Sequence, residues 1–241
     1  MNQVQIFQDV RSLASAAAEQ FIRLADQSIR NWGRFSVALS GGNTPKVLYR
    51  VLVTPENQAR LDWDHIHLFW GDERHVPHNH PDSNYRMVKE ILLNQIDIPE
   101  GNIHSVPTEI DVHQAAFQYE ASMREFFSGD WPRFDLIFLG MGEDGHTASL
   151  FPNSAGLEDK THWFIANYAP KRGAWRLTLT THAINAARNI LVMVSGKSKA
   201  KMFEEVITGS EEIKEKPIHL ITPKDGKMVW FVDKDAVTHY K

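Results

Sequence analysis

Residues 134–152 of this 241-residue chain read FDLIFLGMGEDGHTASLFP. The apolar run from Phe134 to Leu139 has the length and composition of a buried strand, and it stops abruptly at glycines, acidic residues and one histidine. In an open α/β sheet, ligands bind in the loops at the carboxyl ends of the strands. His146 is therefore expected at a ligand-binding edge, beside Glu143 and Asp144. Because an unperturbed imidazole titrates near neutral pH, His146 is a candidate general base.

This loop allows two other interpretations. Its three glycines match the Gly-x-Gly-x-x-Gly spacing of a dinucleotide-binding fingerprint, which also follows a strand. That fingerprint requires a helix N-terminus facing a pyrophosphate, whereas the two acidic residues of the loop repel such an anion and Pro152 limits any helix that follows. We therefore reject a dinucleotide site. The second alternative, a histidine that only satisfies hydrogen bonds of the loop, stays open on this segment alone.

Strand-like and helix-like segments alternate along the chain. The predicted strands are Phe35–Leu39, His65–Trp70, Phe134–Leu139, Trp163–Tyr168, Leu177–Thr180, Asn189–Ser195 and Met228–Val232. The predicted helices run from a cap at Asp9 to near Gly33, from Pro45, from a cap at Ser83 to Leu93, from a cap at Asp111 to about Phe127, and from Ser198 to Ile207. This alternation predicts an α/β fold, with a Rossmann-like, doubly wound and mostly parallel sheet and helices on both faces. No linker or repeat interrupts it, so residues 1–241 are expected to form a single catalytic domain.

Composition narrows the possible partners. The net charge is −4 and no basic run occurs, which argues against nucleic acid and membrane surfaces. There is no cysteine, so disulfides and thiolate chemistry are excluded. The N-terminal residues do not have the pattern of a signal peptide, and no apolar stretch is long enough to span a bilayer. We expect a cytoplasmic protein that acts on a small molecule.

A second glycine-containing loop suits an anion. The segment Ser40-Gly41-Gly42-Asn43-Thr44-Pro45 lies between a predicted strand and a predicted helix. Glycines let backbone N–H groups converge on a phosphate, and the helix N-terminus adds the positive end of its dipole. The spacing is not that of a nucleotide P-loop. A plain tight turn with a helix cap explains the same segment equally well.

Charged side chains follow three other strands. Asp72 and Arg74 come directly after a predicted strand, where they form either a solvated salt bridge or a contact to a sugar hydroxyl and an anion. Arg176 and Lys199 lie near a strand end and a strand-to-helix turn, and either one alone passes as a surface charge. Lys199 belongs to a turn of the kind that binds phosphate.

Histidine pairs invite a metal-site interpretation. His65 and His67 lie on one face of a predicted strand, and His75, His78 and His80 cluster in one loop. Neither group has the cysteines or the helical His-x-x-x-His pair that are typical of zinc sites, and we expect no metal. A serine esterase triad is also unsupported, because no Gly-x-Ser-x-Gly elbow occurs.

Taken together, these motifs resemble the 6-phosphogluconolactonase family over nearly the whole chain. The segments that carry the resemblance are Ser40–Pro45, Gly71-Asp-Glu-Arg-x-Val-Pro77 with Ser83-Asn84, Gly140–Pro152, Arg176-Leu-Thr-Leu-Thr and Gly196-x-x-Lys199-Ala. That family belongs to one superfamily with glucosamine-6-phosphate deaminases and ribose-5-phosphate isomerases. The deaminases carry Asp-Gly-His-x-Ala-Phe-Asn-Glu-Pro, whereas this chain has Ser-Leu-Phe between Ala148 and Pro152. The missing Asn-Glu pair favours the lactonase.

The resemblance implies hydrolysis of 6-phospho-D-glucono-1,5-lactone to 6-phosphogluconate, the second step of the oxidative pentose phosphate pathway. It implies that His146 is the general base for water attacking C1, with Asp144 orienting it. The loop of residues 40–45, Arg176 and Lys199 would hold the 6-phosphate. Asp72 would bind a sugar hydroxyl and Arg74 an anion. No metal or organic cofactor is implied, and the protein is expected to be a monomer or homodimer.

Two rival functions remain at this stage. One is a sugar-phosphate isomerase or deaminase on the same fold, in which His146 helps to open a ring. The other is a non-catalytic sugar-phosphate sensor, which usually carries a DNA-binding or partner module for which this chain has no room.

Overall fold

Seven parallel strands form the central sheet of residues 3–209 and 216–238, which are the residues that the computed structural model describes. The strands are β1 (Gln3–Phe7), β2 (Phe35–Leu39), β3 (Ile66–Trp70), β5 (Ile103–His104), β6 (Leu136–Gly140), β9 (Asn189–Val194) and β10 (Lys227–Asp233). Their order across the sheet is β1-β10-β9-β6-β2-β3-β5, and every neighbouring pair is parallel.

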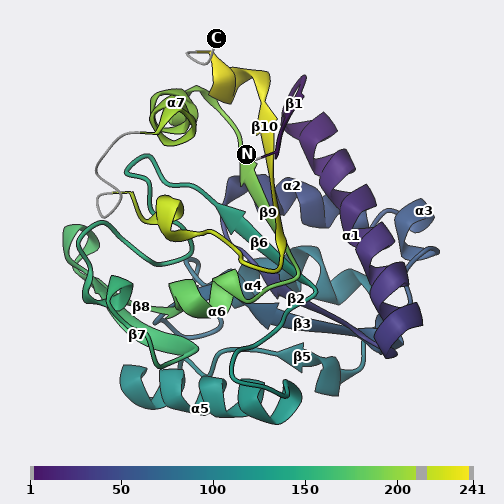
Figure 1. The fold of residues 1–241 in the computed structure, drawn as a ribbon. Coiled ribbons are helices and arrows are strands. Elements are labelled where there is room, and N and C mark those ends of the chain that lie inside the picture. Colours follow the sequence, from purple (N-terminus) through teal and green to yellow (C-terminus); the bar gives the residue numbers. More distant parts are fainter. Residues whose placement is uncertain (1–2, 210–215, 239–241) are drawn as a thin grey trace.

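Helices cover both faces of this sheet. They are α1 (Val10–Trp32), α2 (Asn43–Leu52), α3 (Pro55–Gln58), α4 (Asn84–Ile91), α5 (Val112–Phe126), α6 (Thr181–Asn185) and α7 (Ala200–Thr208). From β2 the chain steps towards the β5 edge, and from β6 it steps towards the β1 edge. Because crossovers are right-handed, these opposite steps place the connecting helices on opposite faces. Figure 1 shows α1 and α2 on one side of the sheet and α7 on the other. The predicted doubly wound α/β fold is confirmed.

A second, three-stranded sheet corrects part of the prediction. It has the order β4-β8-β7 and consists of β4 (Asp72–Arg74), β7 (Phe164–Ala169) and β8 (Ala174–Leu179), all antiparallel. From the sequence, the two later strands were predicted to belong to the alternating parallel pattern. That placement was wrong, because only the turn from Pro170 to Gly173 separates them, and a parallel crossover needs a dozen or more residues. Gly173 closes the turn with φ 59°, a left-handed conformation that favours glycine.

The ends of the helices follow the predicted caps closely. Asp9 accepts a hydrogen bond from the Ser12 N–H at 2.8 Å, and Ser83 and Asp111 cap α4 and α5 in the same way. The start of α2 differs from the prediction: it begins at Asn43, so Pro45 is its third residue. The strands β1, β4 and β5 were not predicted. β1 mixes two glutamines with three apolar residues, β4 is polar and β5 has two residues, so none of them carries a long apolar run.

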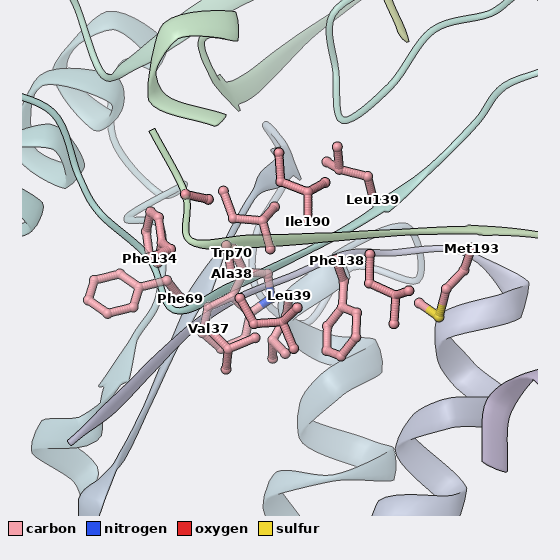
Figure 2. Packing of buried hydrophobic residues seen from close by; sticks show 14 of the residues in the cluster. Val37, Ala38, Leu39, Phe69, Trp70, Phe134, Phe138, Leu139, Ile190 and Met193 are labelled. Atoms are coloured by element: carbon pink, nitrogen blue, oxygen red, sulfur yellow. The ribbon is translucent and has the colours of Figure 1, made fainter. Parts of the chain in front are cut away.

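The core explains why the central strands read as continuous apolar segments. Every residue of β2 is buried, because helices cover both faces of the sheet. Figure 2 shows side chains from β2, β3, β6 and β9 packed together, with Phe69 and Phe134 edge to face at 5.3 Å between ring centroids. Among the described residues, no helix has the length and apolar character needed to cross a membrane.

Candidate active site

The carboxyl ends of the central strands surround a cavity of about 440 Å³. Its position follows from the topology: β2 and β6 are neighbours, but the segments after them leave towards opposite faces of the sheet. The diverging loops leave a crevice at this point, which is where ligands bind in doubly wound sheets. The volume lies within the range of about 300–1,000 Å³ that is usual for small-molecule pockets.

The cavity brings together residues that are far apart in sequence. All nine predicted substrate-binding residues line it, together with His146. The nine are Ser40, Gly41, Gly42, Asn43, Thr44, Asp72, Arg74, Arg176 and Lys199. Asp144 does not line the cavity but contacts the ring of His146 from behind.

The loop after β6 holds the histidine through a carboxylate. Oδ1 of Asp144 contacts Nδ1 of His146 and accepts the His146 backbone N–H at 3.2 Å. This contact holds the pKa of Asp144 well below its usual range, so the carboxylate is ionised and accepts a hydrogen bond from the Nδ1–H group. Nε2 is then the nitrogen without a proton in the neutral ring. Phe151 packs against the ring at 4.8 Å between centroids.

Glycine is required next to this pair. The N–H of Gly142 donates to the carbonyl of His146 at 2.8 Å, which closes the loop on itself. A Cβ at Gly142 would overlap Nδ1 of His146 and lie 2.6 Å from Oδ1 of Asp144. The loop therefore brings its backbone against the two side chains, and any larger residue must displace them.

The loop after β2 is anchored from the core. The buried hydroxyl of Tyr49 accepts the N–H of Ser40 at 3.1 Å and donates to the Ser40 carbonyl at 2.7 Å. Gly42, with φ 101°, precedes the first turn of α2. Thr44 shares a hydroxyl–hydroxyl hydrogen bond of 2.7 Å with Ser195, which joins this loop to the one after β9. Nζ of Lys199, in that second loop, lies 4.0 Å from Oε1 of Glu143.

Asp72 and Arg74 lie in strand β4, which corrects their predicted place in a loop. Asp72 is buried and accepts the hydroxyl of Ser149 at 2.7 Å. Arg74 is paired across the small sheet with Arg176 and donates to the Asp82 carbonyl. The solvated salt bridge that this segment also allowed does not form within the described part of the chain. Burial, followed by the nearby charge of Arg74, lowers the pKa of Arg176.

The buried carboxylate of Glu73, between Asp72 and Arg74 in β4, holds the N-terminus of α4 against the cavity. It accepts the backbone N–H groups of Arg74, Asn84 and Tyr85, each at 2.7 Å. The Asn84 side chain in turn donates to the Asp72 carbonyl at 2.9 Å. Burial outweighs these hydrogen bonds and raises the pKa of Glu73 to about 7.

This shift predicts a pH-dependent stability. The folded protein binds the Glu73 proton more tightly than the unfolded chain does, so this carboxyl contributes stability that is present below pH 4.5 and lost as the pH rises through about 7. Across that window the wild type should lose about 3 kcal/mol of unfolding free energy relative to Glu73→Gln, which cannot titrate. Urea unfolding of both proteins at several pH values from 4.5 to 8 measures the difference. Parallel pH profiles for the two proteins would contradict it.

Other polar residues line the cavity without having been predicted as site residues; they include Asn84, Ser149, Arg172, Ser195 and Ser198. Asn84 and Ser149 fell inside the quoted motifs, but nothing in their spacing indicated that they reach Asp72. Arg172 lies in the hairpin turn that was not predicted. Ser195 was counted as the last residue of a strand, whereas β9 ends at Val194 and leaves Ser195 in the loop.

Histidines of both clusters make hydrogen bonds to other protein groups. His67 bonds His104 at 3.2 Å between ring nitrogens, and His75 and His78 bond the backbone carbonyls of Ile110 and Val106. Within residues 3–209 and 216–238, no group of three or more His, Asp or Glu side chains is arranged to hold a metal ion.

Comparison with known proteins adds independent information. A family described as glucosamine-6-phosphate isomerases/6-phosphogluconolactonase matches residues 8–230. A 6-phosphogluconolactonase from Synechocystis sp. is 42% identical over 87% of this chain and 86% of its own length. One from Nostoc sp. is 38% identical over 97% of this chain and 96% of its own length. The crystal structure of 6-phosphogluconolactonase from Thermotoga maritima has a TM-score of 0.83 at 28% identity, covering 97% of this chain and 100% of that one. The matched region includes every loop around the cavity.

Proposed function

The chain belongs to the glucosamine-6-phosphate isomerase/6-phosphogluconolactonase family, and from this premise we propose that it hydrolyses 6-phospho-D-glucono-1,5-lactone to 6-phospho-D-gluconate. The reaction is the second step of the oxidative pentose phosphate pathway. The observation that carries the proposal is the Asp144–His146 pair at the wall of a cavity whose other walls supply cations and a helix N-terminus. A phosphorylated ester substrate needs these features together: a base for water and a separate place for the phosphate.

His146 acts as the general base in this proposal. The Nδ1–H group of His146 donates a hydrogen bond to Asp144, so Nε2 is free to accept a proton from water. The water oxygen bonds to C1 as its proton passes to Nε2. The bond from C1 to the ring oxygen then breaks, and the imidazolium returns the proton to that oxygen. The ionised Asp144 stabilises the intervening imidazolium, which is the role of a carboxylate behind a catalytic histidine.

The phosphate is assigned to the N-terminus of α2 and the cationic side chains near it. The first N–H groups of α2 have no partner within the helix, and they face an anion favourably because of the helix dipole. Lys199 and Arg176 supply positive charge around the same cavity. Binding the phosphate there fixes C1 relative to His146, and such positioning can lower the barrier by several kcal/mol.

Asp72 and Arg74 are assigned to the remainder of the substrate. Asp72 is held by Ser149 and presents a buried acceptor to the cavity, which suits a sugar hydroxyl. Arg74 presents a guanidinium at the same wall and suits an anionic group.

Hydrolysis of freshly prepared lactone tests the proposal. Product formation is coupled to 6-phosphogluconate dehydrogenase and compared with an enzyme-free blank, because the lactone also opens spontaneously. We expect a large excess over the blank and no ammonium release from glucosamine 6-phosphate. Ammonium release at a competitive rate would establish a deaminase instead. Binding of sugar phosphates without turnover of either substrate would establish a sensor.

A further inference from the structure

A third arginine reaches the cavity from the turn between β7 and β8. Arg172 belongs to the short turn of residues 170–172, and it lines the cavity. Its guanidinium carbon lies 5.9 Å from the ring centroid of Phe151, and the same ring packs against His146 at 4.8 Å. Phe151 therefore has the proposed base and a guanidinium as its neighbours. This arrangement puts a positive charge on the side of the cavity where C1 would react.

Among the described residues, the charge of Arg172 has no counterion. No carboxylate lies within 4.0 Å of its guanidinium among residues 3–209 and 216–238. Its field reaches the neighbouring strand, where it contributes to the lowered pKa of Arg176 after burial and Arg74. Four cationic side chains line the cavity, against the two carboxylates of Asp72 and Glu143, so its lining has an excess of positive charge.

Hydrolysis of the lactone creates the missing anion. The lactone is neutral at C1. Addition of water at C1 and departure of the ring oxygen as a hydroxyl leave a carboxylic acid, which releases one proton to solvent near neutral pH. The product therefore differs from the substrate by one negative charge at C1, whereas its phosphate is unchanged. A guanidinium binds a carboxylate through two parallel N–H bonds, a geometry that a neutral ester does not match.

We propose that Arg172 binds the carboxylate of the product, so that the cavity has two anion subsites, one for the phosphate and one at C1. The inference rests on the proposed function, because only an aldonate product carries this second anion. It assigns to the hairpin turn a role in product affinity and hence in product inhibition.

Two ligands distinguish the proposed carboxylate subsite from the phosphate subsite. 6-Phosphogluconate carries both anions, whereas glucitol 6-phosphate has the same phosphate and hydroxyls with a neutral CH₂OH at C1. Titration calorimetry on the intact protein gives both affinities. In Arg172→Gln, we expect the affinity for 6-phosphogluconate to fall about five- to tenfold, as for a partly exposed charged hydrogen bond, and that for glucitol 6-phosphate to stay within about twofold.

Lys171→Gln is the matched control. Lys171 is the neighbouring exposed cation of the same turn and does not line the cavity. This variant removes the same charge from the turn, so it should leave both affinities unchanged. A fall for 6-phosphogluconate in both variants would mean a general field effect and would overturn the inference.

The remaining outcomes are also decisive. Equal weakening of both ligands in Arg172→Gln would assign Arg172 to the phosphate, and no weakening of either would remove it from the binding site. Both results overturn the carboxylate subsite while lactone turnover by the wild type leaves the proposed function intact. A wild type that neither turns over the lactone nor binds these ligands would instead overturn the proposed function.

Discussion

Replacing His146 with alanine is expected to lower kcat/KM for the lactone about 10²- to 10⁴-fold, the range of a general base in other enzymes. The loss should appear in kcat, because the residues proposed to bind the phosphate are unchanged in this variant. The coupled assay with freshly prepared lactone measures the effect, after subtraction of the spontaneous rate. His146→Ala removes the only imidazole that lines the cavity in the described chain.

Two controls separate a chemical defect from a structural one. Circular dichroism and thermal unfolding should match the wild type, and the affinity for glucitol 6-phosphate should be retained. If His146→Ala keeps most of the activity with these controls satisfied, the lactonase stands and the base is a different group.

Gly142→Ala is expected to lower kcat about 100-fold or more, although Gly142 contributes no side chain to the chemistry. Its Cβ would overlap Nδ1 of His146 and approach Oδ1 of Asp144 to 2.6 Å, so the pair must separate or turn. A misplacement of about 1 Å at a catalytic group is enough for a loss of this size. The same coupled assay measures it.

Gly101→Ala is the control for a glycine replacement as such. A Cβ at Gly101 meets nothing within 4 Å, and Gly101 does not line the cavity. This variant should keep full activity. If Gly142→Ala were equally active, Asp144 would not need to stay in its present contact with His146, and its proposed orienting role would be wrong.

The parallel sheet could be predicted from the sequence because strands that are buried on both faces are continuous apolar runs. Strands such as Phe35–Leu39 are apolar at nearly every position, and the loops that follow them carry many of the residues that line the cavity. Since the carboxyl ends of parallel strands share one edge, finding the strands also located the loops.

The small antiparallel sheet has a weaker signal in the sequence. β4 is three residues long and polar, and its buried Asp72 and Glu73 are satisfied by Ser149 and by the N-terminus of α4. Such partners come from tertiary packing and have no fixed sequence spacing. Arg172 escaped attention for the same reason, because its place at the cavity depends on the hairpin between β7 and β8.

Tyr49 orders the start of the loop after β2, residues 40–45, before any ligand binds. Its hydroxyl saturates both backbone groups of Ser40, so this end of the loop takes its shape during folding and does not wait for the ligand. The conformational entropy of Ser40 is lost when the protein folds, so ordering Ser40 does not reduce the binding free energy of the ligand. It follows that backbone N–H donors for the anion must come from the residues after Ser40, and that slow amide exchange at Ser40 should be the same with and without substrate.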